Sequence, residues 1–305
     1  MTAAQRIYTP FEAPYRMAMG LMALPLEEWI EPDAALTGDL REKRRLLRDH
    51  RDDVFRTLPG SEPAQDELLQ LLARHLAVQA PDTYRLSAGQ LELTPLGERH
   101  DLANPGLAPL DLAGRLVQED LCILQRDDEA WRLTAASVCF PTRWNLASKM
   151  GKPLAEIHAP VPGFGERLAA PVDLFFDRIR EDKPVWRLNW SLLDDPALFQ
   201  PSGHGRRTPR DDIDAANAGE MVTLRVERQT LRRLPRTGAI VFTIRIHRWP
   251  LSVLAGQPEA ARRLRQSMDS MPAALRNYKS LGVLGAAVEG YLDRVIAGPS
   301  NQTHS

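Results

Sequence analysis

Three segments in the second half of the chain alternate hydrophobic and polar residues with the two-residue period of a β-strand. They span residues 185–192, 221–231 and 239–247, and the turn-forming residues LPRTG lie between the last two. Alternation of this kind is typical of antiparallel strands that have one face on a core. An upstream hairpin is indicated by the runs LCILQRD and WRLTAASVCF, which flank a turn at 127–129. The sequence therefore predicts an antiparallel sheet.

Segments with the helical period surround these strands. Residues 64–79 place their leucines on one stripe, which predicts an amphipathic helix. Thr142 follows a proline and is expected to cap a short helix through Lys149. We therefore expect one α+β domain, in which helices precede, connect and follow the strands of the sheet. The other helices are expected at 39–50, 153–158, 172–180, 257–267, 272–278 and 283–296.

The composition excludes several classes of function. The chain has 305 residues and a formal net charge of −1, so no overall field recruits nucleic acid or an anionic membrane. No apolar run approaches the roughly 18 residues that cross a bilayer, and no signal peptide is readable. The only cysteines are Cys122 and Cys139, too few for a four-cysteine iron–sulfur or zinc site. A cytoplasmic protein without nucleic-acid or membrane partners is therefore expected.

His158 is the strongest candidate ligand for a metal. It is expected to end a short helix, and the residues APVPG after it form a stiff exit that fixes its direction. A setting without nearby charge favours the neutral imidazole that ligates iron or zinc. No HxxH or HExxH spacing supplies a second protein ligand, so this histidine suits mainly an iron whose other ligands come from a porphyrin. A capping or packing histidine is the alternative.

Cys139 is a competing axial ligand, because thiolate-ligated heme is the usual means of oxidising unactivated C–H bonds. It lies in a predicted strand beside Phe140, with no cation or helix terminus to lower its pKa, so a buried structural thiol is expected. His75 lies close to the apolar stripe of its helix and is expected to be a hydrogen-bonded structural histidine. No GxSxG, P-loop or GxGxxG pattern is present. The sequence therefore lacks the motifs expected for hydrolase, kinase and nicotinamide-dependent activities.

A second group of candidates lies on the polar face of the predicted strand pair. A symmetric turn would place Glu227 opposite Arg245 and Arg225 opposite His247. One interpretation is a solvated sheet face with a Glu227–Arg245 salt bridge. The other is a buried polar wall above a cofactor, where an arginine stabilises oxygen or an anion and Glu227 attracts a protonated amine. The residues of this wall are Arg225, Glu227, Gln229 and Arg245, extended by Arg187 and Asn189 on another strand.

Three blocks of the sequence resemble one bacterial family. They are SVCFPTRWNLASKMGKPLAEIHAPVPGF at 137–164, WRLNW at 186–190 and LRVERQTLRRLPRTGAIVFTIR at 224–245. Over roughly residues 8–295 the chain is similar to the heme-dependent oxidative N-demethylases, or dimethylamine monooxygenases. The resemblance implies a single heme-binding domain, with a PAS-like antiparallel core at 111–250 between an N-terminal arm with helices at 1–110 and C-terminal helices with a tail at 251–305.

The resemblance further implies heme b with an axial histidine, which by motif position is His158. It implies an oxygenase that uses O2 to demethylate a small secondary or tertiary amine and releases formaldehyde, with electrons from separate reductase or ferredoxin components. A heme-based gas or redox sensor and a heme-free binding protein are the alternatives. The residues then expected at the cofactor are Arg143, Trp144, His158, Arg187 and Asn189, and those expected to act on oxygen, propionate or amine are Arg225, Glu227, Gln229 and Arg245.

Overall fold

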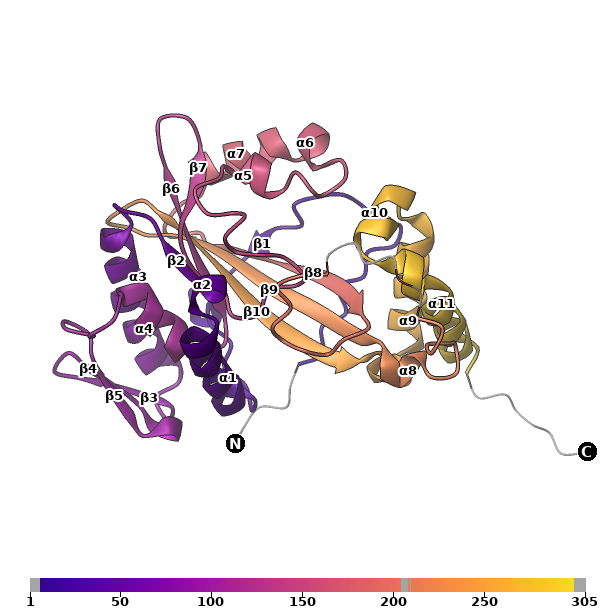
Figure 1. Ribbon diagram of the computed structural model, residues 1–305, viewed down its shortest axis with the longest axis horizontal. Coiled ribbons are helices and arrows are strands. Elements are labelled where there is room, and N and C mark those ends of the chain that lie inside the picture. The colour runs from indigo at the N-terminus through magenta and orange to yellow at the C-terminus, as the bar shows by residue number, and fades with distance from the viewer. Residues whose placement is uncertain (1–5, 204–207, 209, 299–305) are drawn as a thin grey trace, which may run out of the picture.

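The computed structural model describes residues 6–203, 208 and 210–298. Its centre is a seven-stranded antiparallel sheet in the order β1-β8-β9-β10-β6-β7-β2 (Figure 1). The strands of this sheet are β1 (Met22–Ala23), β2 (Phe55–Thr57), β6 (Asp120–Arg126), β7 (Trp131–Ser137), β8 (Val185–Leu193), β9 (Thr223–Arg233) and β10 (Ile240–Pro250). A smaller antiparallel sheet consists of β3 (Tyr84–Ser87), β4 (Gln90–Leu93) and β5 (Glu98–Asp101).

Helices form in the remaining segments that carry a helical pattern. The α-helices of the described residues are α1 (Leu36–Asp49), α2 (Arg51–Val54), α3 (Glu62–Gln79), α4 (Pro109–Leu116), α5 (Leu154–Ile157), α6 (Phe164–Arg167), α7 (Ala169–Arg178), α8 (Ala218–Met221), α9 (Pro258–Ser270), α10 (Ala273–Tyr278) and α11 (Leu281–Ala297). Short 3-10 helices are η1 (Leu26–Glu28), η2 (Thr94–Leu96) and η3 (Leu251–Leu254).

The helices pack around the sheet in three groups (Figure 1). One group, with α1, α3 and α4, buries the sheet face that carries Ile123. A second group, with α5 and α7, covers the opposite face, which carries Leu124. The third group, with α9 and α11, packs on β9 around Val226. The sheet is therefore covered on both faces, and its polar side chains lie in the spaces between these apolar clusters.

The structure confirms the α+β class, the antiparallel sheet and most of the predicted helices. The predicted helix from Thr142 to Lys149 is wrong, because residues 142–151 form bends and turns. Thr142 instead makes an isolated bridge to Gln200, and its hydroxyl is engaged by side chains from the sheet. A long-range contact thus replaces the local cap that the sequence suggested.

The register of β9 and β10 also differs from the predicted one. Leu234 N donates to Ala239 O at 2.8 Å, so the loop between the paired positions contains residues 235–238 rather than a symmetric turn centred on residue 236. The strands consequently pair Glu227 with Ile246 and Arg228 with Arg245. A shift of one residue moves a side chain to the other face of a sheet. Arg245 therefore lies on the face opposite Glu227, and the predicted Glu227–Arg245 pair is wrong.

Glu67 of α3 binds the turn between β9 and β10 through hydrogen bonds. This carboxylate is only 1% exposed, and it accepts hydrogen bonds from Arg236 N at 2.6 Å and Thr237 N at 2.8 Å. The Thr237 hydroxyl donates to it as well, at 2.7 Å. A buried carboxylate with three donors strongly favours one turn geometry over others. Glu67 therefore stabilises the observed register.

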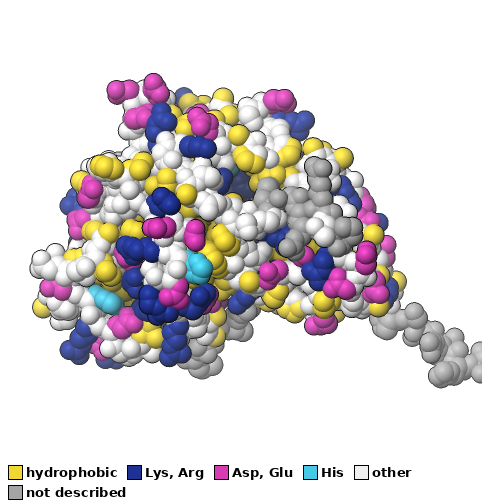
Figure 2. All heavy atoms as spheres, viewed as in Figure 1, with side chains coloured by type: hydrophobic (Ala, Val, Ile, Leu, Met, Phe, Trp, Pro, Cys, Tyr) yellow, Lys and Arg dark blue, Asp and Glu magenta, His cyan; other side chains and the backbone are white. Residues whose placement is uncertain are grey.

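The visible surface mixes acidic and basic side chains without a large region of one sign (Figure 2). This distribution matches the balanced net charge of the chain. Among the described helices, none combines the length and the apolar character that a membrane crossing requires.

Candidate functional site

His158 directly follows α5, and its position is fixed by one backbone carbonyl. The backbone N–H of His158 donates to Leu154 O at 3.1 Å, and ring Nδ1 lies 2.9 Å from the same oxygen. Because a carbonyl oxygen only accepts, Nδ1 carries the hydrogen and Nε2 has the lone pair. The ring also stacks on Phe164, with centroids 4.5 Å apart. No hydrogen bond engages Nε2 within the described part of the chain, so the free nitrogen is the one that could bind a metal.

The surroundings of His158 keep its imidazole neutral. Burial lowers the pKa of His158, and the positive charges of Lys149 and Arg187 lower it further, against the hydrogen bond to Leu154. Lys149 is close because its Nζ donates to Ile157 O at 2.8 Å. The neutral ring was predicted, but the predicted absence of nearby charge is wrong. Burial together with two nearby cations, rather than an uncharged setting, favours the form that ligates iron.

Glu227 of β9 is the centre of a hydrogen-bonded network on the same sheet face as Arg187. Thr142 Oγ1 donates to Oε1 of Glu227 at 2.5 Å. Gln229 Nε2 donates to Oε2 at 2.7 Å, and Asn189 Nδ2 lies 3.3 Å from that oxygen. All three donors are neutral, so the network orients the carboxylate without neutralising it. Asn189 and Gln229 are thus brought together with Glu227, as the strand pairing of β8 with β9 requires.

Arg187 of β8 interacts electrostatically with both the histidine and this network. Burial lowers the pKa of Arg187, and the Glu227 carboxylate opposes that shift. Its Nε is buried and has no hydrogen-bond partner among the described residues. A buried guanidinium nitrogen without a partner is costly. An anionic ligand placed beside Arg187 would remove that cost, which makes this residue the natural anchor for a carboxylate or phosphate.

The other two arginines of the predicted wall have structural partners. Arg225 donates from Nη2 to Phe140 O at 2.6 Å, from Nη1 to Ala197 O at 3.0 Å and from Nε to Thr142 Oγ1 at 3.0 Å. Arg225 therefore ties the loops beside β9 to the sheet. Arg245, on the opposite face, forms an ion pair with Asp33 at 2.7 Å. The structure does not bring Arg245 together with Glu227, His158 or Arg187.

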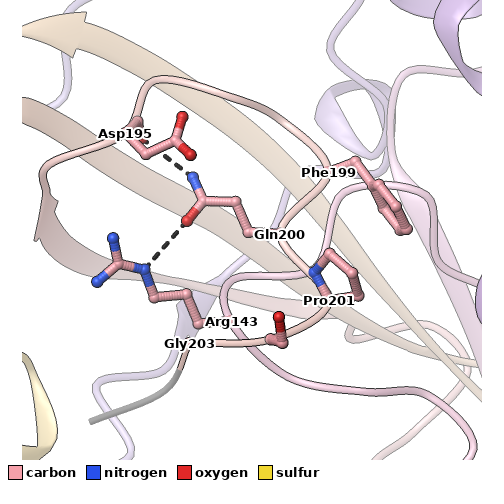
Figure 3. A pocket seen from close by; sticks show the side chains of 7 residues that line it. Arg143, Asp195, Phe199, Gln200, Pro201 and Gly203 are labelled. Atoms are coloured by element: carbon pink, nitrogen blue, oxygen red, sulfur yellow. Dashed lines mark hydrogen bonds between the residues drawn. The ribbon is translucent and has the colours of Figure 1, made fainter. Parts of the chain in front are cut away.

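Arg143 donates its hydrogen bonds within a separate polar cluster. Its Nε donates to Gln200 Oε1 at 3.1 Å, and its Nη2 forms a buried ion pair with Asp194. Together with Asp195, Phe199 and neighbouring residues it lines a cavity of about 220 Å³ (Figure 3). His158 does not line this cavity. The expected contact of Arg143 with a porphyrin edge would require these bonds to break.

Trp144, the other residue expected at the porphyrin edge, is half-buried and contacts two of the hydrophobic clusters. The ammonium of Lys149 lies 5.5 Å from the centroid of its ring. Because Lys149 also adjoins His158 through the Ile157 carbonyl, Trp144 belongs to the neighbourhood of the histidine.

The surroundings of Cys139 and His75 indicate structural roles for both residues. Cys139 is fully buried, and burial raises the pKa of its thiol to about 12 against the charges of Lys43 and Arg115. The predicted buried thiol is confirmed, whereas its predicted place in a strand and the predicted absence of cations are wrong, because β7 ends at Ser137. His75 packs edge-on against Trp29 with centroids 5.3 Å apart, but its buried Nε2 has no partner within the described residues. His75 was predicted to be a hydrogen-bonded structural histidine, and the structure shows a packed ring whose Nε2 lacks such a bond within the described residues. No group of three or more metal-ligating side chains is found among the described residues.

The sequence interpretation missed two residues of the Glu227 network. Thr142 was expected to cap a helix, and only the proline before it hinted that the strand ends there. Lys279 follows α10, and its Nζ lies 3.3 Å from Asn189 Oδ1. No periodicity or motif marks Lys279, because the contact joins segments 90 residues apart.

A family model described as "Haem-dependent oxidative N-demethylase, alpha subunit-like" matches residues 20–289. The matched region contains the whole seven-stranded sheet, His158, Arg187 and the Glu227 network. The chain therefore belongs to the haem-dependent oxidative N-demethylase alpha subunit-like family.

Proposed function

We propose that this protein is a heme-dependent oxygenase that removes a methyl group oxidatively from a small secondary or tertiary amine. In this proposal heme b binds through His158 as the axial ligand. The observation that carries the proposal is the engagement of His158 Nδ1 by the Leu154 carbonyl, which leaves Nε2 as the ligating atom. A metal-bound histidine usually donates a hydrogen bond from the ring nitrogen that does not bind the metal. This hydrogen bond fixes the tautomer and the ring orientation.

The residues beside His158 fit a heme in a second respect. A heme b carries two propionate carboxylates, and the unpartnered Nε of Arg187 is a buried cationic donor near the histidine. Pairing it with a propionate would satisfy a nitrogen that has no partner within the described chain. Lys149 and Trp144 also adjoin the histidine. We therefore assign Arg187 to a propionate and keep Trp144 as an apolar contact of the porphyrin.

The Glu227 network supplies the amine site in this proposal. A methylated amine is protonated near neutral pH, and Glu227 would accept its N–H as a charge-assisted hydrogen bond. Thr142, Gln229 and Asn189 hold the two carboxylate oxygens in place, so little side-chain entropy is lost when the amine binds. Bound heme would supply the reductive activation of O2 and the oxidation of the C–H bond next to nitrogen.

The balanced reaction takes the amine, O2, two electrons and two protons to the demethylated amine, formaldehyde and water. The proposal assigns electron delivery to separate reductase or ferredoxin components, as the sequence resemblance implies. It also treats the chain as one heme-binding domain with a PAS-like core. The strand order β7-β6-β10-β9-β8, with α5, α6 and α7 between the hairpin and the other three strands, supports that description.

Heme reconstitution tests the proposal. Purified protein supplied with heme should develop a Soret band, and His158→Ala should lose it. His100→Ala is the matched control, because His100 lies in the small sheet, bonded to Glu98. Reduced holoprotein should then release formaldehyde only when a methylated amine and O2 are both present. A Soret band of equal intensity in His158→Ala would refute the ligand assignment, and heme binding without amine-dependent formaldehyde would refute the enzymatic role.

A further inference from the structure

Lys279 comes from the C-terminal quarter of the chain and reaches into the sheet. Its Nζ donates to Trp190 O at 2.5 Å and lies 3.3 Å from Asn189 Oδ1. The ammonium also sits 4.9 Å from the centroid of the Trp190 ring. The next residue, Ser280, is buried and has φ of 59°, a left-handed conformation that residues other than glycine rarely adopt. A strained junction between α10 and α11 therefore accompanies the lysine contact.

The contact fixes the side-chain amide of Asn189 in one orientation. An ammonium group has only donors, so the Asn189 oxygen must face Lys279. A carboxylate has only acceptors, so the Asn189 nitrogen must face Glu227. The opposite orientation would place a donor against a donor and an oxygen against a carboxylate. Lys279 thus determines which end of Asn189 faces Glu227, although it makes no hydrogen bond to Glu227 itself.

The charges around the lysine support this arrangement at neutral pH. Burial lowers the pKa of Lys279 to about 8, Glu227 on β9 opposes the shift and Arg187 on β8 adds to it. Tyr278, the preceding residue, also faces Glu227, because burial and that carboxylate raise the pKa of Tyr278 to about 12. The ammonium form therefore predominates at pH 7 and retains its donors.

We propose that Lys279 is a positioning residue for the amine site, which acts through Asn189 to orient the Glu227 carboxylate. This inference rests on the proposed function, because it concerns how Glu227 receives a protonated amine. It links the junction between α10 and α11 to the site, because Lys279 lies between these two helices. Losing the ammonium frees Asn189 to rotate, and the carboxylate then loses one of its three donors, which loosens its orientation although Thr142 and Gln229 still bind it.

Substitution of Lys279 in the heme-loaded protein tests the proposal. Lys279→Met keeps the length of the side chain but removes its donors, and we expect the KM for the amine to rise about tenfold with kcat changed less than threefold. Lys279→Arg should recover most of the loss, because a guanidinium also presents only donors. Lys183→Met is the matched control, since Lys183 is exposed. An unchanged KM in Lys279→Met, with normal heme loading and turnover, would overturn the proposal.

A double-mutant cycle separates positioning from a general loss of packing. If Lys279 acts through Asn189, then Lys279→Met should have little further effect on KM in an Asn189→Leu background. Additive effects of the two substitutions would overturn the proposal. Should the wild-type protein bind heme but show no amine-dependent turnover, the proposed function fails and this inference fails with it, whereas active wild type with additive effects rejects Lys279 alone.

The titration of Lys279, followed by NMR, tests the proposal without any turnover, because the chain has few lysines. The chain has only Lys43, Lys149, Lys152, Lys183 and Lys279, so carbon-13 labelling can resolve each side chain by NMR. Glu227→Gln removes the carboxylate that raises the pKa of Lys279, and the titration of Lys279 should move to lower pH. If folded Glu227→Gln protein leaves that titration unmoved, the connection between the two residues is absent and the proposal is wrong.

Discussion

The Thr142 hydroxyl donates to Glu227 across 85 residues of sequence, at a distance of 2.5 Å. The same oxygen accepts from Arg225 Nε at 3.0 Å. One hydroxyl thus joins a buried arginine, whose other donors hold backbone carbonyls, to the carboxylate that we assign to the amine. The loop after β7 is thereby connected to the middle of β9.

Thr142→Val should weaken amine binding more than it weakens the fold. The substitution preserves shape but removes the donor to Glu227 and the acceptor for Arg225, and a hydrogen bond to a charged group contributes about 1.5–3 kcal/mol. We expect kcat/KM for the amine to fall at least tenfold. Thr134→Val is the control, because Thr134 bonds Gln125 within the β6–β7 hairpin. Steady-state formaldehyde assays measure both, and equal losses in the two variants would contradict the role of Thr142.

Arg187→Met should lower the affinity for heme while leaving the heme-free fold as stable as before. The variant removes a buried nitrogen that has no partner among the described residues, so the folded state loses little. Arg232→Met is the control, since its Nε is likewise buried and without a partner in the described chain, but lies on the other sheet face. Heme transfer to an apo-globin should be about tenfold faster in the first variant only.

Arg245→Met should destabilise the protein without changing the KM for the amine. The ion pairs of Arg245 with Asp33 and Asp39 are largely buried, and removing one partner of such a pair costs about 3–5 kcal/mol. Arg262→Met, which loses an exposed pair with Glu259, should cost under about 1 kcal/mol. Chemical denaturation measures both changes. A large rise in KM with intact stability would return Arg245 to the amine site.

His75 should make the fold sensitive to mild acid. Burial lowers the pKa of His75 to about 4 from its ordinary value of 6.5, so the unfolded chain binds a proton more readily. The contribution of His75 to stability is complete above pH 6.5 and is lost as the pH falls towards 4. With a discount for partial exposure, the loss is about 2 kcal/mol.

His75→Leu is the variant that tests this acid sensitivity. It should flatten the pH dependence of the unfolding free energy between pH 6.5 and 4, whereas His100→Ala should not. Denaturation curves at several pH values decide the matter. If the wild type and His75→Leu lose stability in parallel over this range, protonation of the His75 ring does not cause the acid sensitivity.

The alternating pattern of β8, β9 and β10 was sufficient to predict the sheet and the shared face of Asn189, Glu227 and Gln229. The register in which β9 and β10 pair could not be predicted equally well. The register depends on whether the loop contains residues 235–238, and side-chain bonds from Glu67 on another element stabilise that choice. Local pattern contains no information about such a distant carboxylate.

His158 could be selected from the sequence because its helix end and the prolines after it are local features. Thr142 and Lys279 could not, because their contacts with the Glu227 network join distant segments. The small sheet of β3, β4 and β5 was missed for a different reason. Few of its positions are buried, chiefly Tyr84, Leu91 and Leu93, so its hydrophobic signal is weak.

The length of one turn has a consequence for how this protein can change over evolutionary time. Adding or deleting a residue between Leu234 and Ala239 would exchange the side chains on the two faces of β10, bringing Arg245 to the amine side and exposing Ile246 to the acidic partners of Arg245. Point substitutions in the turn leave that assignment intact. Single-residue insertions or deletions that shift this register are therefore incompatible with the site, and relatives that share its chemistry should vary more in the composition of this loop than in its length.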